Sequence, residues 1–144
     1  MTDIVIDTNT WLDWLVFNDP CVAQLRRAVT DGSVMPWATA RTRAELTDVL
    51  QRPQFAARLP DPLRALHDYD QLICLAPEPP PCGLVCRDPD DQVFIDLAVT
   101  RGAGWLLTKD KALLALARAA RRRFGLLVLV PSAFAGPATM TPGL

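Results

Sequence analysis

Short apolar runs alternate with amphipathic segments along most of this chain. Four runs have the length and composition of strands, and they cover residues 3–6, 34–37, 105–107 and 126–130. Between them, apolar residues recur three and four positions apart, which is typical of helices with one buried face. The expected helices cover residues 11–17, 19–30, 39–52, 62–72, 88–101 and 113–123. Strands that alternate with helices predict an α/β protein of three layers, in which a central parallel sheet is flanked by helices.

The length of the chain bears on its domain organisation. Its 144 residues suit one domain, which we place at residues 1–135, followed by a weakly ordered C-terminal tail at 136–144. Residues 76–83 hold four prolines, so we expect a loop there that cannot join the sheet. No apolar run approaches the roughly 18 residues of a membrane span, and the acidic start is unlike a secretory signal. We therefore expect a soluble, cytoplasmic protein that binds no membrane.

Composition narrows the chemistry that the chain can perform. Half of the residues are hydrophobic and the net charge is −1, which indicates a globular protein. Only Lys109 and Lys111 are lysines among the basic residues; arginine suits phosphate contacts, although a GC-rich genome gives the same bias. His67, which we expect on a helix surface, is the only histidine, so a two-histidine cleavage of RNA is excluded within one chain. Neither Ser33 nor Ser132 lies in a nucleophile elbow, so carboxylates and a metal must carry any catalysis.

The four cysteines show no spacing typical of a zinc knuckle. They stand at positions 21, 74, 82 and 86. A cytoplasmic location argues against disulfides, so we expect free, partly buried thiols, with a metal site at the last three as the alternative.

Carboxylates follow two of the predicted strands. The first and third runs lead into Asp7 and, after two intervening residues, Asp110. Ligands of open α/β sheets bind at the C-terminal ends of the strands, so these two carboxylates are expected at one site. Glu45, on a predicted helix, and the acidic stretch 88–91 lie between them in sequence. Gathered carboxylates repel one another unless a cation lies between them, which points to a divalent metal.

Four segments resemble the PIN-domain family, in particular its branch of toxins from toxin–antitoxin pairs. They are IVIDTNTWLDWL, TARTRAELTDVLQRPQF, CRDPDDQVFIDLAVTRGAGWLLTKDKALL and LLVLVPSAF, and together they cover nearly the whole chain. The resemblance implies a PIN-like fold with a doubly wound parallel sheet, a metal-dependent ribonuclease activity and an acidic pocket at the C-terminal edge of that sheet.

The resemblance also implies roles for individual residues. Four carboxylates match the family's acidic positions, and they belong to Asp7, Glu45, Asp91 and Asp110. Polar residues that support such a cluster are matched by Asn9, Thr39 and Thr108. Mg²⁺ is usually held by one or two carboxylates, waters and substrate phosphate. We assign Asp7 and Asp91 as direct ligands of Mg²⁺ or Mn²⁺, with Glu45 and Asp110 binding directly or through water.

Basic residues close to the expected pocket are candidates for contact with a phosphodiester. They are Arg41, Arg43, Arg87 and Lys109. For each of them, solubility or pairing with a nearby acid is the alternative interpretation. The family branch commonly has glycine where Lys109 stands, so this side chain either contacts phosphate or points to solvent.

The remaining acids receive structural interpretations. Asp88 is expected to cap its helix rather than bind metal, and Asp96 lies about 140° around that helix from Asp91, which favours a surface role. The residues interpreted as structural or exposed are Asp13, Asp19 and Asp48.

The four tryptophans divide into two pairs. Trp11 and Trp14 share one face of a predicted helix, where they would suit the interface of a homodimer or an antitoxin. Trp37 and Trp105 lie in predicted strands and are expected in the core.

We interpret the chain as an endoribonuclease that cleaves single-stranded RNA, a toxin silenced by an antitoxin protein. An RNA-processing nuclease of the same fold, without an antitoxin, is the alternative. A haloacid-dehalogenase-type phosphatase also begins with a strand that ends in aspartate, but its motif needs a second acid where Asn9 stands. A non-catalytic binding module would normally have lost one or more of the four acids.

Overall fold

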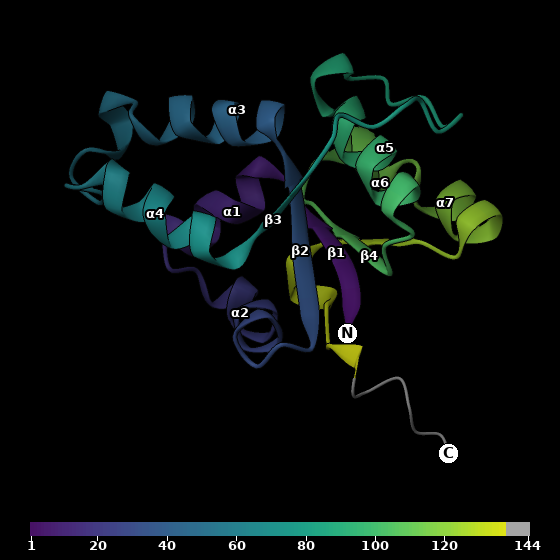
Figure 1. The fold of residues 1–144 in the computed structure, drawn as a ribbon, viewed down its shortest axis with the longest axis horizontal. Coiled ribbons are helices and arrows are strands. Elements are labelled where there is room, and N and C mark those ends of the chain that lie inside the picture. The colour runs from purple at the N-terminus through teal and green to yellow at the C-terminus, as the bar shows by residue number, and fades with distance from the viewer. Residues whose placement is uncertain (138–144) are drawn as a thin grey trace.

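The computed structural model describes residues 1–137, which form a parallel sheet with helices packed on both faces (Figure 1). The strands are β1 (Thr2–Ile6), β2 (Val34–Thr39), β3 (Cys74–Ala76), β4 (Trp105–Leu107) and β5 (Leu127–Leu129). Their order across the sheet is β3-β2-β1-β4-β5, and every neighbouring pair is parallel. The expected α/β class with a central parallel sheet is confirmed.

Seven α-helices are present within the described residues. They are α1 (Thr8–Leu15), α2 (Ala23–Thr30), α3 (Ala40–Leu50), α4 (Pro62–Leu72), α5 (Gln92–Arg101), α6 (Lys111–Leu114) and α7 (Ala117–Phe124). Single 3₁₀ turns occupy Pro20–Val22, Pro53–Phe55, Pro89–Asp91 and Pro131–Ala133. Helices α1 to α4 cover one face of the sheet and α5 to α7 the other, as Figure 1 shows.

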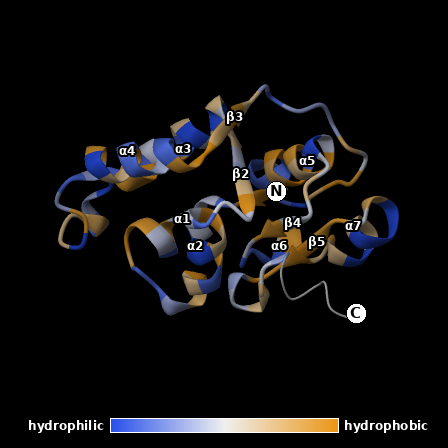
Figure 2. Ribbon diagram, turned by 60° about the horizontal axis from the view of Figure 1, so that its bottom comes forward, coloured by the Kyte–Doolittle hydropathy of each residue, from blue (hydrophilic) through white to orange (hydrophobic). Residues whose placement is uncertain are grey.

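The two cores draw on alternate residues of the same strands. In β1, Ile4 and Ile6 pack against the first group of helices, whereas Val5 packs against the second. Successive side chains of a strand point to opposite faces, so a strand covered on both sides must be apolar throughout. Figure 2 shows this as hydrophobic strands β4 and β5 beside an α7 whose outer face is hydrophilic.

The register of the central strands decides where the predicted site forms. Ile6 of β1 lies opposite Leu107 of β4, and the Asp7 N–H donates to the Leu107 carbonyl at 3.1 Å. The residues that follow these two strands therefore emerge at the same edge of the sheet.

Three differences from the sequence expectation concern β3, α1 and the last expected helix. Strand β3 was not expected, because it is three residues long, its Leu75 is exposed, and prolines follow it at once. Its last residue, Ala76, pairs with Thr39, so the expectation that residues 76–83 stay outside the sheet is wrong at Ala76. Helix α1 begins directly after Asp7 rather than at Trp11, because the Asp7 side chain caps it. The last expected helix is divided into α6 and α7 by a turn at residues 115 and 116.

The proposed interface role of Trp11 and Trp14 loses its structural basis. Both indole rings are buried, and Trp11 meets the ring of Tyr69 from α4 edge to face, at 4.8 Å between centroids. Because α4 covers α1, a face that looks amphipathic in sequence is part of the core. Trp105 is buried as expected, whereas Trp37 is half-buried beneath the guanidinium of Arg101, 3.6 Å from the ring centroid.

Asp96 is buried, so the surface position expected for it is wrong. Its Oδ1 accepts hydrogen bonds from the Cys82 N–H at 3.0 Å and from Gln92 Nε2 at 2.9 Å. The side chain thus fastens the proline-rich loop to α5, a long-range contact that helical geometry alone does not reveal.

The expectations for the cysteines and for His67 are met within the described residues. All four cysteines are free thiols, and His67 is exposed on α4. None of the helices in residues 1–137 is both long and apolar enough to span a membrane. Apart from residues 136 and 137, the expected C-terminal tail lies outside the described residues.

Candidate functional site

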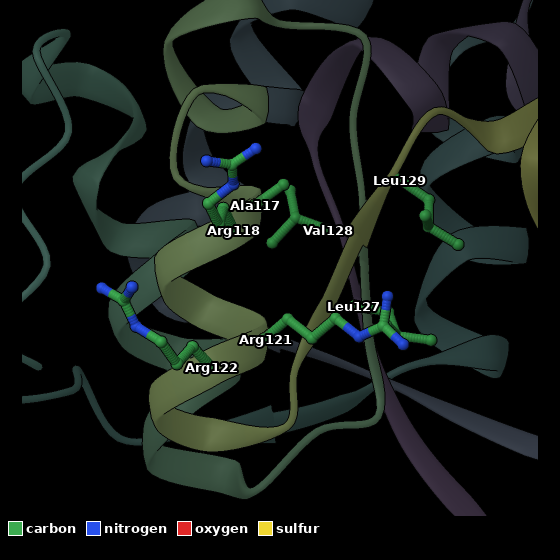
Figure 3. A pocket seen from close by; sticks show the side chains of 7 residues that line it. All are labelled: Ala117, Arg118, Arg121, Arg122, Leu127, Val128 and Leu129. Carbon is green, nitrogen blue, oxygen red and sulfur yellow. The ribbon is translucent and has the colours of Figure 1, made fainter.

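A cavity of about 240 Å³ opens at the C-terminal edge of the sheet, among carboxylates from three separate segments. Asp7, Glu45 and Asp91 line it, together with Asn9 and Arg52. A larger cavity of about 580 Å³ lies between α7 and β5, and it is lined by arginines and apolar residues without any acid (Figure 3). The acidic cavity is therefore the candidate for metal chemistry, although it is the smaller of the two.

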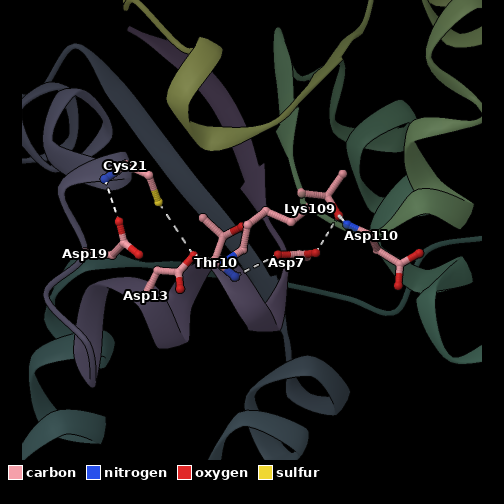
Figure 4. Close-up of polar contacts among 8 residues, drawn as sticks. Asp7, Thr10, Asp13, Asp19, Cys21, Lys109 and Asp110 are labelled. Carbon is pink, nitrogen blue, oxygen red and sulfur yellow. Dashed lines mark hydrogen bonds and ion pairs between the residues drawn. The ribbon is translucent and has the colours of Figure 1, made fainter.

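Asp7 is held rigidly at the end of β1. Its Oδ1 accepts a hydrogen bond from the Thr10 N–H at 2.9 Å, which caps α1 (Figure 4). Its Oδ2 accepts a hydrogen bond from the Thr108 hydroxyl at 2.5 Å. Burial raises the pKa of the Asp7 carboxyl, while the bonds from Thr108 and Thr10 oppose that rise. Each oxygen keeps a further lone pair for another partner.

Thr108 joins the ends of three strands. Its N–H donates to the Leu129 carbonyl of β5 at 2.9 Å, and its hydroxyl donates to Asp7 of β1. The same hydroxyl accepts a hydrogen bond from the Asp110 N–H at 2.9 Å. Asp110 in turn caps α6 by accepting from the Ala112 N–H at 2.7 Å. One buried hydroxyl thus sets the positions of the two strand-end aspartates relative to each other.

Asp91 lies at the end of a 3₁₀ turn, where α5 begins, and faces Asp110 from the opposite side. One carboxylate oxygen from each of Asp88, Asp91 and Asp110 lies within 4.8 Å of the other two. Desolvation, followed by a hydrogen bond and charge repulsion from Asp110, raises the pKa of Asp91 to about 7. The Oδ2 of Asp91 is buried without a hydrogen-bond partner in the described part of the chain.

Glu45 reaches the cavity from α3. The start of this helix is held by a reciprocal pair of bonds: the Thr42 N–H donates to Thr39 Oγ1 at 3.2 Å, and the Thr39 N–H donates to Thr42 Oγ1 at 3.0 Å. Partial burial and the charge of Asp90 raise the pKa of Glu45. Thr39 is buried and caps the helix, so it supports Glu45 through the backbone and does not line the cavity.

Two of the four predicted phosphate-contacting residues are engaged within the protein. Arg43 forms a bidentate pair with Asp70, with Nε and Nη2 at 2.8 and 2.7 Å from its oxygens. Lys109 Nζ lies 2.5 Å from Asp13 Oδ2. Arg41 and Arg87 are exposed, and neither guanidinium is paired within residues 1–137.

The structure adds two residues that the sequence interpretation did not assign to the site. Asp88 does cap its turn, by accepting from the Asp90 N–H at 3.0 Å, and one of its carboxylate oxygens also lies within 4.8 Å of those of Asp91 and Asp110. Arg52 lines the acidic cavity from beyond the end of α3. The spacing of Asp88 from Asp91 is visible in sequence, but sequence alone favours the capping role of Asp88, because Asp88 directly precedes the proline that starts the turn.

A second acidic group, made of Asp13, Asp19 and Cys21, lies on the other side of Asp7. The Lys109 ammonium already neutralises one of its two carboxylates, because Lys109 pairs directly with Asp13. Burial raises the pKa of the Cys21 thiol to about 11, so a thiolate ligand is disfavoured at neutral pH. We therefore place the candidate metal site at the cluster of Asp88, Asp91 and Asp110.

The cluster at the sheet edge fits a hard divalent cation. All its ligand groups are carboxylates, which suit Mg²⁺ and Mn²⁺, and no histidine or thiol belongs to it. The unpartnered Oδ2 of Asp91 and its raised pKa are what gathered acids show when no cation compensates them. The ligand roles of Asp7, Glu45, Asp91 and Asp110 stay predictions, and the geometry is compatible with each.

Comparison with known proteins bears on the whole arrangement. The family model described as PIN domain matches residues 3–112, a stretch that contains all four predicted acidic residues. Comparison with curated proteins gives no match to this sequence.

Proposed function

The chain belongs to the PIN-domain family, whose members are typically metal-dependent nucleases, and from this premise we propose that it is a Mg²⁺- or Mn²⁺-dependent endoribonuclease acting on single-stranded RNA. The observation that carries the proposal is the meeting of carboxylates from β1, α3, α5 and the turn after β4 around one edge of the sheet. Separate elements would have no structural reason to place so many acids together without a cation.

The residues divide the work by their surroundings. The carboxylates of Asp7, Glu45, Asp91 and Asp110 would hold a divalent ion, which would supply positive charge for the scissile phosphate and lower the pKa of a water. Hydrogen bonds to both oxygens hold the Asp7 carboxylate in one orientation. The Thr108 hydroxyl also accepts from the Asp110 N–H, so it fixes the position of Asp110 relative to Asp7. The pKa of Asp91 lies near 7, so at neutral pH a proton competes with a metal ion for its carboxylate.

The substrate must approach an acidic cavity as a polyanion. Arg52 lines the cavity. Arg41 lies on α3, where its charge opposes the rise in the pKa of Glu45. We assign phosphate contact to these two side chains and to the exposed Arg87. Arg43 and Lys109 are assigned structural roles instead, because each already neutralises an aspartate.

We further propose that the activity is that of a toxin controlled by an antitoxin protein. Its support is the resemblance of the four sequence segments to the toxin branch of the family, since no surface feature of residues 1–137 identifies the partner. An RNA-processing nuclease without an antitoxin is the alternative. Expression of the wild type should arrest growth, whereas expression of Asp7→Asn should not. Relief of this arrest by the product of a neighbouring small gene would support the toxin role.

Cleavage of single-stranded RNA by purified protein tests the enzymatic proposal. Activity should require Mg²⁺ or Mn²⁺ and stop on addition of EDTA. Asp7→Asn and Asp91→Asn should each abolish it, because each removes a charged oxygen from the lining of the acidic cavity. The matched pair Glu45→Gln and Asp48→Asn, both on α3, should separate a residue that lines the cavity from one that does not. An Asp7→Asn preparation that cleaves as fast as wild type would refute the assignment.

A further inference from the structure

A groove between α7 and the free edge of β5 carries a chemistry different from that of the acidic cavity. Arg118, Arg121 and Arg122 line it, and its floor is made by Leu127 to Leu129. In Figure 3, the Arg121 side chain extends from α7 across β5 toward Leu127. The cavity volume of about 580 Å³ is large enough for several covalently linked groups rather than a single ion.

The three arginines have no partner of their own. None of their guanidinium groups forms an ion pair or hydrogen bond within the described residues. Elsewhere in the chain, Arg43 is paired with Asp70 and Arg101 with Asp3. Residues three and four positions apart lie on one face of a helix, so the three positive charges are presented together. This face of α7 can therefore bind an anionic ligand.

The floor of the groove is apolar. Leu127 and Leu129 are half-buried, while Val128 is buried against the helices of its face. Guanidinium groups beside exposed apolar surface suit single-stranded nucleic acid, because phosphates pair with the charges and the flat faces of the bases cover the apolar atoms. A free anion or a small organic acid would leave the floor exposed to water.

The groove adjoins the candidate catalytic cluster. Its lining residue Leu129 accepts the Thr108 N–H through its carbonyl at 2.9 Å, and Thr108 donates to Asp7. One strand thus separates the end of the groove from the carboxylates. A polyanion gains little affinity from an acidic cavity, so a nuclease with this site needs positive charge along the path of the strand.

We propose that the α7–β5 groove binds the backbone of single-stranded RNA on one side of the cleaved bond, with Arg118, Arg121 and Arg122 contacting successive phosphates. The identity of the ligand rests on the proposed function, whereas the groove itself is separate from the carboxylates. Affinity for long RNA then depends on the groove, and the chemical step depends on the acids.

Direct binding by the full chain tests this without cleavage. A fluorescently labelled RNA of about 12 nucleotides, within the range of site sizes of such grooves, is titrated with Asp7→Asn protein and followed by anisotropy between 50 and 200 mM salt. The variant that also carries Arg118→Gln, Arg121→Gln and Arg122→Gln should bind at least about tenfold more weakly at the lower salt. The slope of log affinity against log salt should fall by about 2, since each lost contact to a single strand removes about 0.7.

Matched variants make the test specific. Arg123→Gln removes the same charge from α7 outside the groove, where the guanidinium lies over Phe124, and should leave affinity within about twofold. Replacing the three arginines by lysine should keep most of the salt dependence, because the charges remain. If the triple Gln variant does not fold by circular dichroism, Arg121→Gln compared with Arg123→Gln decides instead.

The outcomes separate this proposal from the nuclease assignment. The groove proposal is overturned if the triple Gln variant and its Asp7→Asn parent bind the RNA equally well. It is also overturned if Arg121→Gln and Arg123→Gln lose the same affinity. Groove-dependent binding of poly-glutamate but not of RNA would overturn it as well, and would make the occupant an acidic protein segment. Groove-dependent RNA binding by a wild type that cleaves nothing would leave the groove in place and refute the nuclease.

Discussion

Replacement of Lys109 by alanine separates two roles for a residue next to the catalytic cluster. Sequence alone favours a phosphate contact or a solvent-facing side chain, whereas the structure pairs its Nζ with Asp13 Oδ2 at 2.5 Å. The Asp13 side chain is 7% exposed, so Lys109→Ala leaves a buried carboxylate without its cation. We therefore expect loss of stability first, with changes at the site as a consequence.

The magnitude follows from the exposure of the two partners. Breaking a fully buried ion pair by removing one partner costs about 3–5 kcal/mol. The Lys109 side chain is 46% exposed, so water screens the pair and we expect about 2 kcal/mol. For a chain of this size that corresponds to a fall in melting temperature of about 6 °C. Lys109 stands between Thr108 and Asp110, so Mn²⁺ affinity should also fall, by about tenfold.

Urea unfolding of four proteins measures the coupling: wild type, Lys109→Ala, Asp13→Asn and the double variant. Asp13→Asn should restore most of the stability lost in Lys109→Ala, because it removes the unpaired charge, giving a coupling energy of about 1–2 kcal/mol. Lys109→Arg should retain most of the stability and the Mn²⁺ affinity. Unchanged stability of Lys109→Ala together with a raised KM for RNA would refute the ion-pair role and reinstate the phosphate contact.

Three further outcomes are expected from the geometry of the cluster. Millimolar Mn²⁺ should raise the melting temperature of the wild type by binding only the folded state, and Asp7→Asn should blunt that gain in a thermal scan; no shift in either protein would contradict a metal site. The metal-free protein should lose stability as pH rises from about 4 toward 7, because the raised pKa of Asp91 means that the folded state binds the proton more tightly than the unfolded state. Urea midpoints across this range check the sign, and they should fall less in Asp91→Asn, in which Asp7 and Glu45 keep their raised pKa. Thr108→Val should lower the free energy of unfolding by about 1–3 kcal/mol and weaken Mn²⁺ binding, because it leaves Asp7 Oδ2 and the Asp110 N–H without their partner. Thr108→Ser keeps the hydroxyl and should show neither effect in urea unfolding or in the thermal scan with Mn²⁺.

Much of the candidate site was predictable because its main features are local. An apolar run followed by a polar turn residue marks the end of a buried strand, and strands that alternate with helices must run parallel. Asp7 and Asp110 were therefore expected at one edge, as the pairing of Ile6 with Leu107 shows. The choice of Glu45 and Asp91 drew on the family resemblance, since a single acid on a helix has no periodicity that distinguishes it.

The partners of the charged side chains were decided only by the tertiary structure. Lys109 and Asp13 are 96 residues apart, and Arg43 and Asp70 are 27 apart, so neither pair leaves a mark in local patterning. The same holds for Trp11, whose apparent outer face is covered by Tyr69 of α4. The sequence by itself determined the alternation of strands and helices and the edge at which carboxylates gather, because both follow from spacing along the chain. Which charges are neutralised within the protein, and which stay free for a ligand, depends on contacts that form only when distant segments pack together.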